Sequence, residues 1–218
     1  MMNLKYVFVL QMMFFGVRSA RISNIGEQLL AAATEGDVES TKYLIEHGAN
    51  VNVIDMFHYT PLHYASECGH IEVIKYLIEN GANITAENED EKKPFILAVE
   101  NGQIDAIKCL TKLGANINGQ DRYEWVPLTF AAAKGQTESI KCLIELGANV
   151  NAVNNRKETP LHKAVSKGHI EATKCLIEHG ANVNVENLDK LSPLDFAIEK
   201  GYAELMKFLI KNGANAEH

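Results

Sequence analysis

The stretch Thr60-Pro61-Leu62-His63-Tyr64-Ala65 decides the fold, because it contains a helix start and because it returns along the chain. Thr60 is a strong N-cap residue, since its hydroxyl accepts the free amide protons of a first helical turn. Pro61 suits the position after the cap, where its fixed φ is helical and its missing N–H costs nothing. The same pattern stands at Thr159-Pro160-Leu161-His162-Lys163-Ala164. A short helix is therefore predicted to begin at both places.

Proline and glycine place this pattern in a repeat of 33 residues. No proline lies outside the series, and twelve of the fifteen glycines form two further series with the same period. A fixed period of this length is the signature of a tandem array, and here it predicts six units. The three series are Pro61, Pro94, Pro127, Pro160 and Pro193; Gly36, Gly69, Gly102, Gly135, Gly168 and Gly201; and Gly48, Gly81, Gly114, Gly147, Gly180 and Gly213.

Each unit is expected to hold a second helix after the first. Gly69 ends the helix that begins at Pro61, and the following residues 71–80 carry apolar side chains at helical spacing up to Gly81, which tolerates a positive φ. The first helix has only about eight residues, fewer than the roughly 12 to 15 at which an isolated helix is marginal in water. Neighbouring units must therefore stabilise it by stacking.

The quoted stretches, together with Gly-Ala-Asn at the close of every unit, resemble ankyrin repeats over residues 22–218. The resemblance implies an all-α solenoid of stacked helix–turn–helix units with β-turn fingers. It also implies that His63 and His162 hydrogen-bond neighbouring backbone and so tie one repeat to the next.

We expect the units at 22–54, 55–87, 88–120, 121–153, 154–186 and 187–218. In the first unit Gln28 replaces the proline and no finger precedes it, as suits an N-terminal cap. The sixth unit keeps an apolar second helix and lacks the polar outer face expected of a cap. Where members of the family usually have glycine, the fingers carry other residues, which indicates either strain or a different turn: His58, Glu91, Glu124, Lys157 and Lys190.

Residues 1–21 do not belong to the array. Lys5 precedes an apolar run over residues 6–17, and Arg18-Ser19-Ala20 follows it. The run is too short to span roughly 30 Å of hydrocarbon, but its order is that of a secretory signal with small residues at the cleavage site. We therefore expect a secreted or exported protein, and a cytoplasmic one if the segment is instead an uncleaved membrane-surface or cap-extending helix.

The cysteines favour a reducing compartment. Cys109, Cys142 and Cys175 occupy the same position of the second helix in three consecutive units. Stacked helices lie roughly 8 to 10 Å apart, whereas a disulfide needs Cα atoms closer than about 7 Å. Cys68 lies on the other helix and has no evident partner in the sequence. Four free thiols are predicted, so we expect an exported protein to act inside another cell and not in oxidising fluid.

Charge and motifs exclude several classes of function. The net charge of −7 offers no attraction to nucleic acid. The sequence has no paired Cys-x-x-Cys, no phosphate-binding glycine loop and no nucleophile beside a repeated histidine, so we expect no metal, no cofactor, no small-molecule substrate and no catalysis. Six acidic residues each precede a lysine by three positions, which predicts ion pairs along a solvated helix face, from Glu39–Lys42 to Glu204–Lys207.

Binding of another protein is the function that remains. The framework residues repeat while the finger tips differ, and lysine gathers before the glycine of the later first helices. Aromatic and arginine side chains dominate interfaces, so the fingers and the concave helix surface are the predicted partner site of a monomer. The alternative is an assembly protein that self-associates through its last repeat. The predicted partner-binding residues are Met56, Phe57, Tyr59, Arg122, Tyr123, Trp125, Arg156, Lys134, Lys167 and Lys200.

Overall fold

The computed structural model describes residues 24–215. The predicted signal segment at residues 1–21 lies outside the described residues. Within the described part, no helix combines the length and the apolar character that crossing a bilayer requires.

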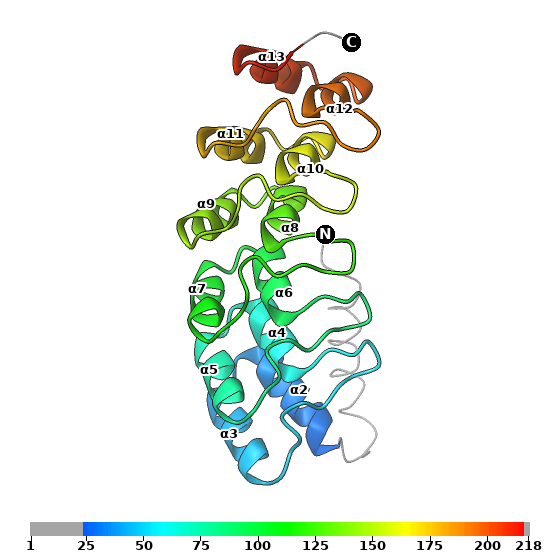
Figure 1. Ribbon diagram of the computed structural model, residues 1–218. Coiled ribbons are helices and arrows are strands. Elements are labelled where there is room, and N and C mark those ends of the chain that lie inside the picture. Colours follow the sequence, from blue (N-terminus) through cyan, green and yellow to red (C-terminus); the bar gives the residue numbers. More distant parts are fainter. Residues whose placement is uncertain (1–23, 216–218) are drawn as a thin grey trace.

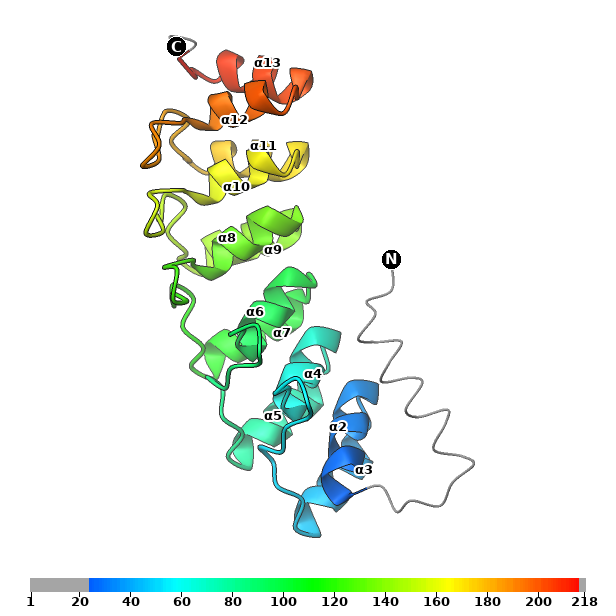
Figure 2. The same ribbon diagram turned by 90° about the vertical axis from the view of Figure 1, so that its right-hand side faces the viewer.

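Residues 24–215 form twelve helices and no strand, which confirms the all-α solenoid. Successive helices pair, and the pairs stack into a long curved array (Figures 1 and 2). The first helices of the pairs are α2 (Ile25–Glu35), α4 (Pro61–Cys68), α6 (Pro94–Glu100), α8 (Pro127–Lys134), α10 (Pro160–Ser166) and α12 (Pro193–Glu199). The second helices are α3 (Val38–Glu46), α5 (Ile71–Glu79), α7 (Ile104–Lys112), α9 (Thr137–Glu145), α11 (Ile170–Glu178) and α13 (Ala203–Lys211).

The quoted stretches start helices as expected. The hydroxyls of Thr60 and Thr159 accept the amide protons of His63 and His162, and each histidine ring accepts the threonine amide in return, so both helices carry a capping box. Ser192 forms a similar box with an aspartate at the start of α12. Helices α6 and α8 begin with proline but have no side-chain cap. The middle of the array therefore has the weaker helix starts.

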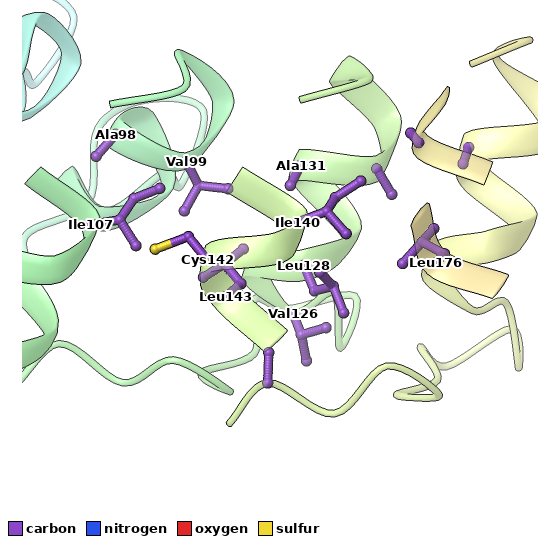
Figure 3. Close-up of a cluster of buried hydrophobic side chains, with 14 of the residues drawn as sticks. Ala98, Val99, Ile107, Val126, Leu128, Ala131, Ile140, Cys142, Leu143 and Leu176 are labelled. Atoms are coloured by element: carbon purple, nitrogen blue, oxygen red, sulfur yellow. The ribbon is translucent and has the colours of Figure 1, made fainter. Parts of the chain in front are cut away.

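The apolar core runs through the stack and is shared between neighbouring pairs (Figure 3). Leu128 of α8 and Ile140 and Leu143 of α9 are completely buried. They belong to one cluster that reaches from Ala33 to Ala214. Because each pair completes the core of the next, the short first helices are stabilised by stacking.

Polar bridges add a second link between units. The Nε2 atoms of His63 and His162 lie 3.0 Å and 3.2 Å from the carbonyl oxygens of Lys92 and Leu191 in the next finger, which is the role that the resemblance implied. Asparagine side chains bridge the loops after the second helices. The Asn52 amide donates to the Gly81 carbonyl at 3.0 Å and accepts the Asn83 amide proton at 2.8 Å. Equivalent bridges are made by Asn118, Asn151 and Asn184.

The backbone angles of the fingers show which turn they form. All five non-glycine residues at the glycine position have positive φ angles, from 58° to 64°. This is the left-handed region, which costs a residue with a Cβ roughly 1 to 2 kcal/mol. The fingers are therefore strained rather than built on another turn.

All four cysteines lie within the described residues as free thiols. Burial raises the pKa of the Cys109, Cys142 and Cys175 thiols, so they are poor nucleophiles at neutral pH. Four of the expected ion pairs on the second helices form, at 2.7 to 3.3 Å: Glu39–Lys42, Glu72–Lys75, Glu138–Lys141 and Glu171–Lys174.

Candidate protein-binding surface

The five fingers lie side by side along the first helices (Figure 1). We call the fingers and the adjoining side of these helices the finger face. The fingers span residues 55–59, 88–92, 121–125, 154–158 and 187–191. Each is closed by the Asp or Asn that opens it: the Asp55 carboxylate accepts the amide protons of Phe57 and Tyr59, both at 2.8 Å. Since this geometry repeats in every finger, the loops are held before any partner binds.

Backbone hydrogen bonds join most neighbouring fingers. The amides of Glu89 and Leu188 donate to the carbonyls of Phe57 and Arg156 in the preceding fingers, at 3.1 and 2.9 Å. The Asn155 amide donates in the same way to Tyr123, at 3.3 Å. Between the fingers at 88–92 and 121–125 the link is an ion pair, Arg122 with Glu91. The finger row is therefore a continuous, preformed surface.

Most of the predicted site residues are exposed on this surface. Met56 is 65% exposed and Tyr123 is 49% exposed, although both side chains are apolar or largely so. The guanidinium of Arg122 lies 4.7 Å from the centre of the Tyr123 ring. The remaining exposed members of the predicted set are Arg156, Lys134, Lys167 and Lys200.

Tyr59 was predicted to bind a partner, but the structure buries it. Its side chain is only 6% exposed, and its ring centre lies 5.1 Å from that of Tyr64 on α4. Burial, with nearby carboxylates, raises the pKa of the Tyr59 phenol to about 12. Phe57 is half-buried against the same aromatic cluster, which also contains Leu97. Tyr59 therefore stabilises the finger at 55–59 instead of offering an anchor, because the returning limb of the turn directs its side chain toward α4.

Trp125, another of the predicted partner-binding residues, is half-buried. The ammonium group of Lys163 on α10 lies 4.4 Å from the centre of the indole ring, in a cation–π contact, and 3.3 Å from a carboxylate oxygen of Glu158. Lys163 was not among the predicted residues, because it lies in the repeated helix start at 159–164 and not in a finger. Its position in the repeat is the signal that points to it. Tyr64 occupies the equivalent position of α4, and its hydroxyl donates to Asp55 in its own finger at 2.6 Å.

The predicted basic residues of the finger face make only exposed ion pairs, or none within the described residues. Arg156 pairs with Asp189 at 2.5 Å and Lys200 with Glu199 at 2.9 Å, but both pairs are exposed, and exposed ion pairs contribute little to stability. Lys134 and Lys167 make no ion pair within residues 24–215. These groups can exchange partners at little cost.

The structure assigns structural roles to four of the repeated histidines. Besides His63 and His162, the rings of His70 and His169 each lie 3.0 Å from a carbonyl oxygen of the preceding unit. Among the described residues, no group of three His, Cys, Asp or Glu side chains could hold a metal ion. A hollow of about 300 Å³ lies between α2 and α3 at the N-terminal end of the stack.

Comparisons with known proteins agree with this architecture. A family model described as "Ankyrin repeats (3 copies)" matches residues 10–88, 84–154 and 128–218. The crystal structure of the human ASB11 ankyrin repeat domain is similar, with a TM-score of 0.77 and 28% identity over 87% of this chain and 85% of that one. An ankyrin repeat domain from Acinetobacter baumannii is similar too, with a TM-score of 0.71 and 30% identity over 86% of this chain and 98% of the other. No curated protein sequence matches the chain.

Proposed function

Because the chain belongs to the ankyrin repeat family, whose fold is a generic protein–protein interaction module, we propose that it is a non-catalytic binding protein that receives one partner on the finger face. The supporting observation is the contrast between a fixed frame and varied tips. The backbone of every finger is held by the same Asp or Asn bonds, while the exposed tip residues differ from unit to unit.

The mechanism is recognition by a preformed surface. Association costs free energy for every loop and side chain that becomes ordered, so fingers that are already ordered leave more of the contact energy as affinity. Met56 and Tyr123 are exposed apolar groups on separate fingers, and covering them removes apolar area from water. Arg122, Arg156, Lys134, Lys167 and Lys200 supply the charges of the site.

The proposal includes delivery of a monomer out of its cell, with loss of residues 1 to about 19. Export rests on the order of charge, apolar run and small residues in the sequence alone. Intact-mass measurement of protein from its native source tests it, because a retained Met1 or Met2 contradicts cleavage.

Self-association is the second candidate, and a specific observation favours it. Leu188, Ile198 and Ile210 are each 50 to 57% exposed in the last unit, which therefore presents apolar groups at the C-terminal end. Sedimentation at rising protein concentration separates the two candidates. A mass that stays monomeric contradicts assembly through this end.

Binding to a partner captured from native tissue tests the main proposal. Met56→Ala and Tyr123→Ala should each weaken that binding about tenfold, which corresponds to roughly 1.4 kcal/mol. The matched control is Tyr43→Ala, because Tyr43 is 60% exposed but lies on a second helix, away from the fingers. Equal effects of the three substitutions would place the partner elsewhere on the molecule.

A further inference from the structure

The formal charge of the finger face is negative in the second and third units and positive in the fifth. The fingers and first helices at residues 55–68 and 88–101 contain six acidic and two basic residues. The equivalent segment at 154–167 contains one acidic and four basic residues, and Lys134 extends this positive region into the preceding unit. The equivalent segment of the fourth unit, residues 121–134, contains two acidic and two basic residues, and that of the sixth, residues 187–200, contains three acidic and two basic residues. Among the charged residues at 55–68, 88–101 and 154–167, only Asp55 also closes a finger, and Asn does the same in other units, so the repeat frame requires none of these charges.

The negative end is a compact cluster. Glu67 and Glu100 occupy equivalent positions on the neighbouring helices α4 and α6, which pack together, and Asp90 lies in the finger that precedes α6. In agreement with this placement, all three carboxylates help to raise the pKa of the buried Tyr59 phenol. Lys92 compensates Glu100 at 2.6 Å. We call Glu67, Asp90 and Glu100 the acidic patch.

The positive end contains an aromatic ring. Lys163 covers the indole of Trp125, and Lys134 and Lys167 occupy equivalent positions at the ends of the neighbouring helices α8 and α10. Stacked helices lie roughly 8 to 10 Å apart, so the positive potentials of these lysines overlap. We call Lys134, Lys163 and Lys167 the basic patch. An anionic group that arrives here meets several cations next to an apolar ring.

Resting on the proposed function, we propose that the finger face binds an extended peptide segment of mixed charge, with its acidic end over the basic patch and its basic end over the acidic patch. The two patches are two stacking steps apart, which is roughly 20 Å. An extended chain advances about 3.3 Å per residue, so about six residues separate the two charged ends of the partner. A uniformly anionic partner such as nucleic acid is repelled by the acidic patch and by the net charge of −7.

Charge of both signs on one face fixes the direction in which the segment lies. Reversal of a bound segment would place its acidic end against Glu67, Asp90 and Glu100 and its basic end against the lysines, which is repulsive at both ends. The surface therefore selects for charge order as well as composition.

Two short peptides map the two ends on the full chain by NMR. The probes are an acetylated Leu-Glu-Glu-Glu amide and an acetylated Leu-Lys-Lys-Lys amide, and chemical shifts detect even weak binding. The glutamate peptide should move backbone signals of residues 121–134 and 154–167, and the lysine peptide those of residues 55–68 and 88–101. If both peptides move the same region, or neither moves the finger face, the proposal is wrong.

A second measurement tests the spacing. One peptide carries three glutamates and three lysines at opposite ends of about six uncharged residues, and the other has the same composition with alternating charges. The segregated peptide should bind at least about tenfold more tightly, because two linked contacts reinforce each other. The double variant Lys134→Ala/Lys167→Ala should remove that preference, whereas Lys108→Ala/Lys207→Ala, with the same charge change on second helices, should keep it. Equal affinity of the two peptides contradicts the proposal.

The two sets of experiments can fail independently, so failure of the mixed-charge segment is distinguishable from failure of the proposed function. Loss of binding of a captured partner in Met56→Ala and Tyr123→Ala, without charge selectivity toward the peptides, supports a finger-face partner and overturns the mixed-charge segment. The opposite result is charge selectivity toward the peptides together with unchanged binding of the captured partner in both variants. It supports binding of a mixed-charge segment and shows that the captured partner does not bind the finger face.

Discussion

The Nε2 atom of His63 lies 3.0 Å from the carbonyl oxygen of Lys92, so the imidazole ring joins helix α4 to the finger of the next unit. The Nδ1 atom of the same ring accepts the amide proton of Thr60 at 3.0 Å. Only the neutral ring with its proton on Nε2 makes both bonds, since a proton on Nδ1 would face another N–H. Burial is the main reason that the pKa of His63 falls to about 4, and burial lowers the pKa of His162 as well.

The first prediction is that stability falls on mild acidification. The unfolded chain takes up a proton on His63 near pH 6.5, while the folded protein does so only near pH 4. Stability from this ring is therefore full above pH 6.5 and is lost as the pH falls toward 4, by about 3 kcal/mol at most. Urea unfolding between pH 7 and pH 4 measures the loss.

His63→Gln should flatten this pH dependence while lowering stability at pH 7, because glutamine does not titrate but disturbs the capping box. An unchanged slope in the His63 variant would show that other groups, such as His162 and the carboxylates, cause the acid sensitivity.

The second prediction concerns the strained fingers. Lys157 has a φ of 58° and is exposed, so Lys157→Gly relieves the left-handed strain without removing a buried contact. Glycine removes a strain of roughly 1 to 2 kcal/mol, but its greater freedom in the unfolded chain offsets part of this gain. We therefore expect the variant to be more stable by about 0.5 to 1 kcal/mol. Lys157→Ala keeps the Cβ and should give no such gain. Thermal unfolding of both variants decides, and a loss of stability in the glycine variant contradicts the strain.

The third prediction restores a missing bridge. Thr85 stands at the position where the other units have Asn52, Asn118, Asn151 and Asn184, and its hydroxyl bonds within its own loop to Asn83 instead. Thr85→Asn provides an amide to span the loops after α5 and α7, so it should stabilise the array by about 0.5 to 1 kcal/mol. The reverse change, Asn118→Thr, should cost a similar amount. Hydrogen exchange of the loop at 114–116 should slow in the first variant, and unchanged exchange would contradict the bridge.

The repeat made the fold predictable from the sequence. The proline series places the starts of the five first helices from α4 to α12, and the glycine series places their ends, because each residue type acts through a backbone preference that needs no tertiary context. The histidine ties were predicted from the resemblance and are present. The turn type was left open in the sequence, because a left-handed Lys157 or Glu124 is held only by the finger around it.

The side chains of the site were less predictable. Tyr59 and Tyr123 are both tyrosines in fingers, but one is buried and the other is 49% exposed, because they occupy different places in the turn. The contact between Lys163 and Trp125 joins residues of two units and follows only from how the units stack. Comparison of the repeats within the sequence locates the variable surface. The burial of each side chain on that surface depends on which residues the stacking of the units brings next to it.

The last prediction separates a binding anchor from a packing residue. Trp125→Ala should weaken binding of a captured partner by about 2 kcal/mol or more, because the indole combines a large apolar area with a cationic neighbour. The folded state should lose only about 1 kcal/mol, which covers the contact with Lys163 and partial burial. Phe57→Ala should show the opposite balance, since the Phe57 ring packs against Tyr59 and Tyr64: about 2 kcal/mol of stability and little binding.

Titration of the partner against each variant gives the binding term, and urea unfolding gives the stability term. Trp125 is the only tryptophan, so a shift of its fluorescence on binding reports directly whether the ring is covered. Lys163→Ala separates the two parts of this site, because it removes the cation of the basic patch and leaves the ring. If Trp125→Ala binds normally and unfolds much earlier, the indole is a packing residue of the finger at 121–125, and the exposed Met56 and Tyr123 remain as the anchors of the finger face.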